Sequence, residues 1–498
     1  MRVLHIHPND NVSVALAPLK RNEIVDGLVA IDDIPAGHKI AIRPIAAGES
    51  VLKYGYQIGR TSVSVAAGEH VHTHNMQSAL KGQLAKGGYH PATGNSSTRA
   101  AKPAVFEGYV RPNGLCAIRN EIWVINTVGC VNHAASMIAQ KAEKLVVHEG
   151  SAVEGVHTFN HPYGCSQLGD DLLNTQLLLS ALARHPNAAG VLVVGLGCEN
   201  NQMKDFITHL GGATEDRYRY FNAQDVNDEQ ETGVKLIQEL AEYASQFKRQ
   251  TLPASRLVLG MKCGGSDGLS GITANPLVGR IADKLAAQGG TSILTEVPEM
   301  FGAEKVLLDR ACDASVYDST IDLVNHFRDY FVKHNEPIDE NPSPGNKEGG
   351  ITTLAEKSLG CVQKGGSSPV KEVLSYGDQV QQGLGGIALL NGPGNDGVSG
   401  TALSAAGAHM VLFTTGRGNP MGFPVPTIKI ATNTPLATHK TNWIDFSAGP
   451  VADGTASMDE LADKLFDQVL DVASGREHTK SENNGYREIS IWKDGVTL

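Results

Sequence analysis

The sequence predicts an α/β protein in which a small all-β domain at the N-terminus precedes a long region of parallel sheet. Two observations lead to this prediction. Short strands separated by Gly, Asp and Pro fill residues 1–82 without a helical period. Strand, glycine-containing loop and amphipathic helix then alternate through much of residues 106–498. That alternation is typical of a Rossmann-like parallel sheet, which binds ligands at the carboxyl ends of its strands.

A stretch without hydrophobic periodicity divides the chain at residues 83–105, where Gly, Ser, Thr, Pro and Ala predominate. Such a composition is typical of a linker. At 498 residues the chain is also too long for one ordinary core. We therefore predict an all-β domain at 1–82, a linker at 83–105, and two α/β domains at 106–250 and 251–498.

The first α/β domain repeats one pattern three times, in which a strand leads through a Gly-Cys loop into a helix. The loop cysteines are Cys130, Cys165 and Cys198, and Cys263 begins an equivalent loop in the second α/β domain. Four cysteines at equivalent strand ends could converge on one crevice. The alternative is that each cysteine is a small residue packed beneath a turn.

The second α/β domain opens with the most informative stretch of the chain. An apolar run at 256–261 predicts a strand buried on both faces, the glycine-rich loop CGGSDGLSG follows, and a helix starts at Pro276. A second strand ends at Glu296, and another helix begins near Pro298. The polar residues of this stretch gather where strands end and helices begin; they are Lys262, Cys263, Ser266, Asp267, Glu296 and Glu299.

A long loop at 341–368 surrounds a short helix, for which Thr353 and Glu356 fit a capping box. Long loops inside compact domains are usually functional or disordered. A set of residues suited to gripping an anion lies in this loop, and Arg417 follows later beside glycines and prolines; the loop residues are Lys347, Glu348, Lys357, Cys361 and Lys364.

Composition narrows the classes of partner. The formal net charge is −11 and no run of Lys and Arg occurs, which argues against nucleic acid. No apolar run reaches the roughly 18 residues of a membrane span, and the N-terminus lacks the features of a signal peptide. Seven cysteines without a secretory signal favour free or metal-binding thiols over disulfides. We therefore expect a soluble cytoplasmic protein with neither a nucleic-acid nor a membrane partner.

The clearest metal signal is the sequence HVHTHN. On an extended strand His70, His72 and His74 point to one face, so two or three imidazoles could share a divalent ion. The alternative is a polar strand end with solvated histidines. Further along the chain, His161 precedes a helix start that carries two aspartates, whose carboxylates are equally explained by the helix dipole.

Other motifs are absent or ambiguous. The sequence holds no Walker loop, no GxGxxG after the first strand, no HExxH and no CxxC, so the glycine-rich loops leave room for a small polar substrate. Glu296 and Glu299 flank a short turn, an arrangement that suits acid/base chemistry or metal ligation. Capping of a helix start by Glu299 is the alternative.

Sequence blocks over nearly the whole chain resemble the altronate/galactarate dehydratase family of sugar-acid hydro-lyases, which also holds a sulfolactate sulfo-lyase. The blocks include GEHVHTHN, YGCSQLGDD, CGGSDGLSGITANP, ENPSPGNKEGGITTLAEKSLGC and the final WKDGVTL. The N-terminal β domain resembles the SAF domain of that family. The departures from the family pattern lie mainly in the linker at 83–105.

The resemblance implies dehydration of D-altronate to 2-dehydro-3-deoxy-D-gluconate in hexuronate breakdown, with Fe2+ or Mn2+ as cofactor. A metal would spread the charge of the enediolate that forms when the proton next to the carboxylate leaves, while side chains act as base and acid. Within this reaction we place the metal on His72 and His74, with His70 as a third candidate ligand. The candidate catalytic residues are Lys262, His161, Glu296, Glu299 and Asp267, and the candidate substrate-binding residues are Arg417, Lys347, Lys364, Ser266 and Asn275.

Several alternatives stay open. The substrate could be galactarate or sulfolactate, or the chain could bind a sugar acid without turning it over, although many polar groups on many loops favour catalysis. An iron–sulfur hydro-lyase is a further alternative, with ligands among Cys130, Cys165, Cys198, Cys263 and Cys361, although no CxxC spacing supports it. The sequence is compatible with a homo-oligomer and leaves open whether the SAF-like domain forms the metal site or acts as a lid.

Overall fold

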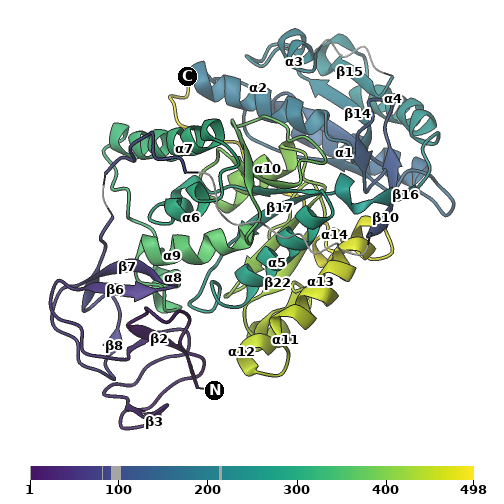
Figure 1. The fold of residues 1–498 in the computed structure, drawn as a ribbon. Helices are drawn as coiled ribbons and strands as arrows, with labels where there is room; N and C mark the ends of the chain where they lie inside the picture. The colour runs from purple at the N-terminus through teal and green to yellow at the C-terminus, as the bar shows by residue number, and fades with distance from the viewer. Residues whose placement is uncertain (1, 81, 91–102, 212–215) are drawn as a thin grey trace.

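The computed structural model describes residues 2–80, 82–90, 103–211 and 216–498. Figure 1 shows the N-terminal β domain at one end, a small α/β unit at the other, and the large α/β unit between them. Within the described ranges, no helix is both long and apolar enough to cross a membrane. The predicted fold class, a small β domain followed by parallel-sheet α/β units, is confirmed.

The β domain consists of short antiparallel strands joined by tight turns. Its largest sheet has the order β1-β2-β5-β8, a three-stranded sheet has the order β6-β7-β9, and β3 pairs with β4. Val12, Val51 and Val71 are buried and pack in the same hydrophobic core as Leu354 and Leu359 of the large unit. The strands are β1 (Val3–Leu4), β2 (Val12–Ala15), β3 (Ile24–Val25), β4 (Leu28–Val29), β5 (Lys39–Ala41), β6 (Ser50–Lys53), β7 (Tyr56–Thr61), β8 (His70–Val71) and β9 (Met76–Gln77).

The small α/β unit is built on a four-stranded parallel sheet of order β13-β12-β14-β15. Its central strands are buried on both faces, as their apolar sequences EIWVIN and AAGVLVVG require. A three-stranded antiparallel sheet, β11-β10-β16, lies beside it. The elements are β10 (Val105–Val110), β11 (Cys116–Ala117), β12 (Glu121–Asn126), α1 (Asn132–Val146), β13 (Val156–Thr158), α2 (Gly169–Ala183), β14 (Ala188–Gly195), α3 (Met203–His209), β15 (Tyr218–Asn222), α4 (Glu229–Ala244) and β16 (Gln250–Pro253).

The large α/β unit is built on a seven-stranded parallel sheet of order β19-β20-β18-β17-β21-β22-β23. Chain order reverses between β17 and β21, which makes the carboxyl end of β17 a topological switch point. The strands are β17 (Val258–Cys263), β18 (Thr291–Leu294), β19 (Val370–Leu374), β20 (Gly386–Leu390), β21 (Met410–Thr415), β22 (Thr427–Ala431) and β23 (Phe446–Ser447). The helices are α5 (Ala274–Ala287), α6 (Glu304–Leu308), α7 (Ala314–Lys333), α8 (Pro344–Glu348), α9 (Leu354–Cys361), α10 (Asp396–Ala405), α11 (Thr434–His439), α12 (Gly449–Asp453), α13 (Met458–Ala473) and α14 (Lys480–Asn483).

Several local predictions need correction. The strand expected to end at Glu296 ends at Leu294, because Glu296 adopts a left-handed conformation with φ of 68°. The helix expected near Pro298 is a single 3-10 turn, η4 (Val297–Met300). The capping box of α9 is half formed: the Thr353 hydroxyl accepts from the Glu356 amide, but the Glu356 carboxylate turns to other partners.

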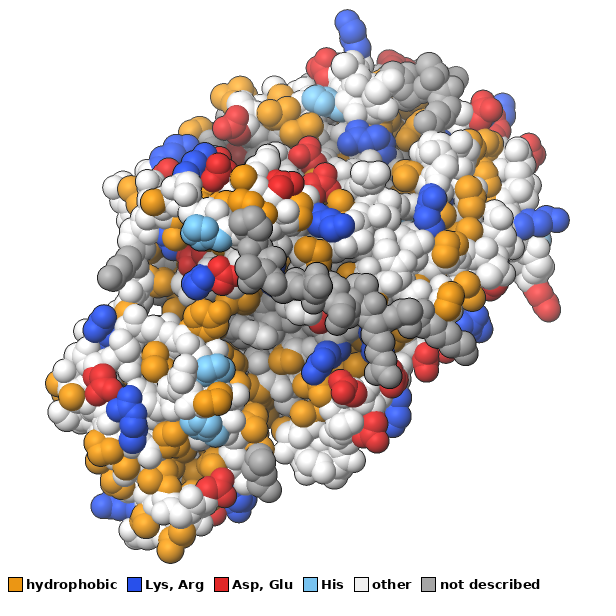
Figure 2. Space-filling view, in the orientation of Figure 1, with side chains coloured by type: hydrophobic (Ala, Val, Ile, Leu, Met, Phe, Trp, Pro, Cys, Tyr) orange, Lys and Arg blue, Asp and Glu red, His pale blue; other side chains and the backbone are white. Residues whose placement is uncertain are grey.

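The predicted domain boundaries stay a prediction, and residues 91–102 of the predicted linker lie outside the described residues. On the face drawn in Figure 2, basic and acidic side chains are interspersed over all three parts of the molecule.

Candidate active site

The carboxyl edge of the seven-stranded sheet carries a dense cluster of charged and thiol side chains. Lys262 and Cys263 end β17, Glu296 follows β18, and Asp396 begins α10 after β20. Helix α9 lies against η4 and brings Cys361 to the same place. The switch-point topology therefore gathers residues from four segments that are far apart in sequence.

Lys262 is the buried centre of this cluster. Its ammonium group contacts Glu296, donates to Asp396 Oδ1 at 2.7 Å and donates to the Cys263 carbonyl at 2.7 Å. Lys364 lies on the other side of Glu296, with its Nζ 3.3 Å from Oε2. Lys262, Glu296 and Lys364 have almost no contact with solvent, whereas the Asp396 side chain is 30% exposed. The attraction among the buried groups is therefore stronger than it would be in water.

Glu299 completes the ion network through Lys357, whose Nζ lies 2.8 Å from Glu299 Oε1. The buried site thus places the lysines 262, 357 and 364 against the carboxylates of Glu296, Glu299 and Asp396. Because each cation is paired with an anion, the three ammonium groups and the three carboxylates can stay ionised although water is largely excluded.

The two glutamates have pKa values that shift in opposite directions. Burial and the nearby Glu299 charge raise the pKa of Glu296 despite its two lysine partners. Burial also acts to raise the pKa of Glu299, but Lys357, Lys364 and Lys262 outweigh it and lower that pKa. Paired carboxyl groups with pKa values pushed apart are typical of acid/base sites.

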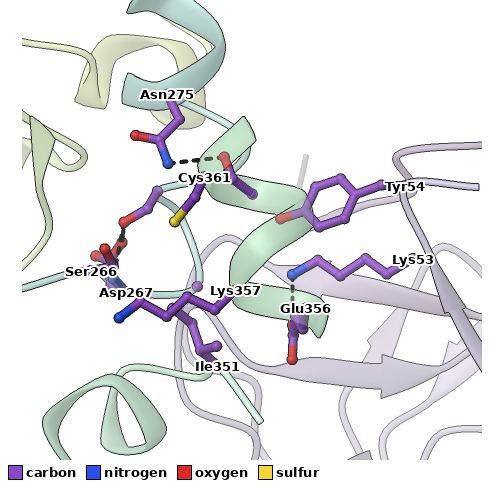
Figure 3. Close-up of a pocket in the computed structure, with 13 residues that line it drawn as sticks. Lys53, Tyr54, Ser266, Asp267, Asn275, Ile351, Glu356, Lys357 and Cys361 are labelled. Carbon is purple, nitrogen blue, oxygen red and sulfur yellow. Dashed lines mark hydrogen bonds and ion pairs between the residues drawn. The ribbon is translucent and has the colours of Figure 1, made fainter. Parts of the chain in front are cut away.

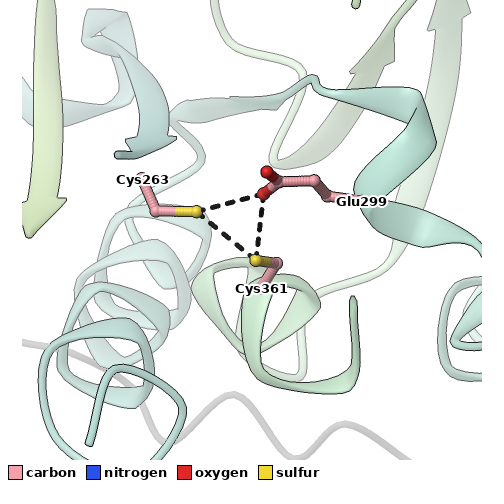
Figure 4. Close-up of side chains that lie close together, drawn as sticks. All are labelled: Cys263, Glu299 and Cys361. Carbon is pink, nitrogen blue, oxygen red and sulfur yellow. Dashed lines mark hydrogen bonds between the residues drawn. The ribbon is translucent and has the colours of Figure 1, made fainter. Parts of the chain in front are cut away.

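Cys263, Glu299 and Cys361 form a compact buried triad (Figure 4). The two sulfur atoms lie 3.4 Å apart, and Glu299 Oε2 lies 3.3 Å from Cys263 Sγ and 3.1 Å from Cys361 Sγ. In the described part of the chain, this is the one group of three or more His, Cys, Asp or Glu ligand atoms that all lie within 4.8 Å of one another.

The donor chemistry of the triad fits a soft or borderline divalent metal. The Lys364 ammonium donates to Cys263 Sγ at 2.9 Å. The hydrogen bond to Cys263 and burial raise the pKa of Cys361 well above its usual range, so the second thiol would give up its proton on metal binding. Thiolate ligands suit iron better than manganese, which prefers oxygen donors.

A small cavity beside Cys361 is shared by the β domain and the large unit (Figure 3). Lys53 and Tyr54 come from the β domain, whereas Glu356 and Lys357 come from α9. The remaining lining is provided by the β17–α5 loop and its surroundings: Ser266, Asp267, Gly268, Ser270, Gly271, Asn275, Ile351, Gly360 and Cys361. The cavity has a volume of about 10 Å³, room for roughly one water molecule, so a sugar acid would bind there only after the lining segments move.

Three family models match successive parts of the chain. The SAF domain of altronate/galactarate dehydratase matches residues 1–79, the second domain of D-galactarate dehydratase/altronate hydrolase matches 108–245, and the C-terminal domain of D-galactarate/altronate dehydratase matches 254–497. The chain is 47% identical over 502 aligned residues to altronate dehydratase of Escherichia coli (strain K12), covering 100% of each chain. The chain belongs to the altronate/galactarate dehydratase family.

Two further relatives of this family cover the chain almost completely. Altronate dehydratase of Bacillus subtilis (strain 168) is 46% identical over 99% of each chain. Galactarate dehydratase (L-threo-forming) of Escherichia coli (strain K12) is 32% identical, covering 98% of this chain and 96% of its own. Both relatives therefore share the whole three-part organisation with this chain.

The predicted catalytic residues of this family member fall into two groups. Lys262, Glu296 and Glu299 lie together in the buried cluster. Asp267 lies at the cavity, where it accepts hydrogen bonds from Ser270, Thr432 and Asn433 and where burial raises its pKa.

His161 lies apart from them, at the edge of the four-stranded sheet. Its Nε2 is 2.8 Å from the Asn126 carbonyl, and its Nδ1 accepts from the Tyr163 amide at 3.2 Å. With burial lowering its pKa, the ring is a neutral group whose two nitrogen atoms are both engaged. The structure therefore does not bring it to the Lys262 cluster.

The predicted substrate-binding residues are similarly divided. Lys364 is in the cluster, and Ser266 and Asn275 line the cavity. Arg417 is half-exposed and lies 3.0 Å from the carboxylate of Glu348. The five residues stay candidates; the fifth, Lys347, is partly buried in the short helix α8 next to Glu348.

The predicted metal histidines lie where the β domain meets the 348–352 segment. The rings of His70, His72 and His74 cluster with His38, whose Nδ1 is 3.0 Å from His70 Nε2. Burial lowers the pKa of His70 to about 3 and that of His72 to about 4, so both rings are neutral near pH 7, as metal ligation requires. His72 Nδ1 lies 2.8 Å from the Thr352 hydroxyl.

The sequence named Lys357 only within the loop set suited to gripping an anion, and it gave no role to Asp396 or His38. Lys357 and Cys361 are four residues apart on α9, a spacing that places both side chains on one helix face. Asp396 ends the block PGND directly before α10, which is a strand-end position of the kind already used for Glu296. His38 had no local signal, because it is 32 residues from His70 in sequence.

Proposed function

We propose that this chain is a hydro-lyase that dehydrates D-altronate to 2-dehydro-3-deoxy-D-gluconate. The observation that carries the proposal is the identity of 46–47% to two altronate dehydratases over 99–100% of each chain. The galactarate dehydratase is less similar, at 32%. The buried cluster at a sheet edge, beside a cavity, supports catalysis over simple binding.

The reaction removes a proton from the carbon next to the carboxylate and a hydroxide from the following carbon, so one water leaves and the enol product becomes a 2-keto acid. Charge builds up on the substrate carboxylate as the proton leaves. The ammonium groups of Lys357 and Lys364 are already held at the site by carboxylates, so they stabilise that charge without reorganisation.

Glu296 and Lys262 are the groups best placed to move protons. Glu296 has a raised pKa and contacts the Lys262 ammonium, so a proton can pass between neighbouring atoms within the cluster. Asp396 Oδ1, 2.7 Å from Lys262 Nζ, holds the lysine in place. We assign Glu296 and Lys262 as the acid/base pair.

Cys263, Glu299 and Cys361 would hold the divalent metal that the family resemblance implies, and their two sulfurs favour Fe2+ over Mn2+. The metal, when bound, supplies Lewis-acid stabilisation of the enediolate. The histidine set of the β domain, His70, His72 and His74, is the second candidate ligand set. Its His72 ring contacts the Thr352 hydroxyl, next to the start of α9.

The deciding experiment is an anaerobic assay of metal-depleted protein with altronate, galactarate and sulfolactate, to which Fe2+, Mn2+ or Mg2+ is returned singly. We expect a 2-keto-3-deoxy acid from altronate, with Fe2+ restoring turnover best. Turnover of galactarate alone would support the proposed dehydration but identify galactarate, and not altronate, as the substrate. Ligand-dependent stabilisation without product under every metal condition would contradict the proposal in favour of a binding role. We further infer a cytoplasmic enzyme whose partner is this small-molecule sugar acid.

A further inference from the structure

Three free cysteines lie at a second sheet edge, outside the Lys262 cluster. Cys130, Cys165 and Cys198 follow β12, β13 and β14, and all three are exposed. These strands are consecutive in the sheet order β13-β12-β14, and neighbouring strands are about 4.8 Å apart. We propose that the three thiolates hold an iron–sulfur cluster at this edge. The expectation that Cys263 shares this crevice is wrong, because Cys263 belongs to the seven-stranded sheet.

Backbone hydrogen bonds lock the three cysteine loops together. The Gly129 amide donates to the Tyr163 carbonyl at 2.8 Å, which joins the Cys130 loop to the Cys165 loop. The Asn201 amide donates to the Gly164 carbonyl at 2.9 Å, which joins the Cys165 loop to the Cys198 loop. The thiols therefore project from one interlocked framework rather than from three independent loops.

The glycine before each cysteine is required by the close approach of a neighbour. A Cβ on Gly129 would lie 2.7 Å from the His161 carbonyl oxygen, and one on Gly164 would lie 2.0 Å from the Thr127 carbonyl oxygen. Gly197 adopts a φ of 126°, which side-chain-bearing residues rarely adopt. The repeated Gly-Cys dipeptide thus reflects a shape in which the loops converge tightly at the edge.

Topology identifies the same edge as a ligand site. The strand order β13-β12-β14-β15 corresponds to the order 2-1-3-4 in the chain, so the direction of winding reverses between β12 and β14. Ligands of open parallel sheets bind in the crevice at such a reversal. Cys130 and Cys198 follow the two strands that border it, and Cys165 follows the strand next to β12.

Two buried side chains at this edge have oxygen atoms without a partner. Asn126, at the end of β12, and Asn201, after Cys198, are fully buried. Among the described residues, their Oδ1 atoms are in the group that has no hydrogen-bond partner. A buried acceptor without a partner costs about 1–3 kcal/mol. Helix α1 also begins at this edge with neither a side-chain cap nor an acidic residue in its first turn, so its N-terminus favours an anionic group.

The spread of the thiols favours a cluster over a single ion. Among the described residues, only Cys263, Glu299 and Cys361 form a group with all ligand atoms within 4.8 Å. Cys130, Cys165 and Cys198 do not form such a group, and an iron–sulfur cluster does not require it, because its cysteines bind separate iron atoms. Three thiolates leave one iron of a four-iron cluster without a protein ligand, open to an oxygen donor.

The test uses full-length protein purified without oxygen. We expect about four acid-labile sulfide and about five iron per chain, of which four belong to the cluster and one to the triad of Cys263, Glu299 and Cys361, with broad visible absorption that fades in air. Cys130→Ser, Cys165→Ser and Cys198→Ser should each lower the sulfide content at least about tenfold, whereas Cys312→Ser, which replaces another exposed free cysteine, should retain it. Iron without sulfide, zinc in place of iron, or unchanged sulfide in all three variants would overturn the proposal.

Alkylation of unmodified protein gives a readout that does not depend on how the variants fold. In the anaerobic protein, Cys130, Cys165 and Cys198 should resist iodoacetamide while Cys312 reacts, and removal of the cluster should expose all of them to the reagent. Equal reaction of the four thiols before cluster removal would refute the site. Neither readout uses turnover, so a failure here is distinct from a failure of the proposed dehydratase activity.

Discussion

Glu356 and Lys357 are adjacent in α9, yet they belong to two different buried ion networks. Glu356 accepts from Lys39 and Lys53 of the β domain, each at 2.9 Å. Lys357 reaches the opposite way, to Glu299 of the active-site cluster. One turn of helix therefore connects the β domain to the catalytic groups, and displacement of α9 at either network affects the other.

Loss of the Glu356 charge should strongly destabilise the protein. Glu356→Gln leaves two buried ammonium groups without their carboxylate, a change that costs about 3–5 kcal/mol. Thermal unfolding should shift to a lower temperature, and turnover should fall because α9 carries Lys357. The control is Glu348→Gln, whose exposed pair with Arg417 should be worth no more than about 1 kcal/mol. Equal unfolding temperatures for the two variants would contradict the proposed connection.

The same network predicts a loss of stability in acid. Burial acts to raise the pKa of Glu356, but Lys39 and Lys53 outweigh it and hold the pKa at about 2, below the usual 4.5. The stabilisation is complete above the unfolded pKa and is lost as the pH falls from about 4.5 towards 2. The free energy of unfolding can be measured with denaturant at pH values from about 6 down to about 3, which spans the start of that window. It should decrease as the pH falls. Glu356→Gln should show a shallower decline.

Replacement of the triad thiols should separate the two candidate metal sites. Cys263→Ser or Cys361→Ser should weaken iron binding by more than about 100-fold and abolish turnover, since even supporting residues of metal sites contribute about 10–100-fold. His72→Ala and His74→Ala should retain the iron that is bound by the triad. Metal analysis after equilibrium dialysis measures both. Retained iron in the cysteine variants together with lost iron in the histidine variants would reverse the assignment.

Removal of the acid/base pair should affect turnover more than substrate binding. Glu296→Gln keeps the shape of the side chain but removes its titrating proton, so we expect kcat to fall by about 100- to 10,000-fold with a small change in KM. Lys284→Met, which removes an exposed ion pair on α5, is the matched surface control. Steady-state kinetics with altronate decide the matter, and a KM effect alone would make Glu296 a substrate-binding group.

Much of the site could be predicted because strand ends carry a local signal. An apolar run followed by a polar, glycine-rich loop placed Lys262, Ser266 and Glu296 at a sheet edge, where the structure has them. His161 carries the same local signal, yet its strand belongs to the other sheet. The alternation of strands and helices in the sequence predicts parallel sheets, but it does not show which strands belong to the same sheet.

The remaining site residues depend on tertiary contacts that leave little trace in the sequence. The sequence indicated Cys361 as a candidate ligand, but its position beside Cys263 depends on how α9 packs against η4. That packing depends in turn on Lys39 and Lys53, about 300 residues earlier in the chain. Buried lysines are rare without a partner, so their burial could be inferred only once Glu356 was placed opposite them.

The apolar core that runs from the β domain into the large unit bears on how substrate reaches the cavity. Val12, Val51 and Val71 pack in one core with Leu354 and Leu359, so a hinge motion that swung the β domain away would expose hydrophobic surface and separate Lys53 from Glu356. We therefore infer that the β domain stays packed against the large unit and does not act as a lid. A sugar acid would enter the cavity through smaller movements of the segments around Ser266 and Ile351. On heating, the β domain and the large α/β unit should unfold together in one cooperative transition.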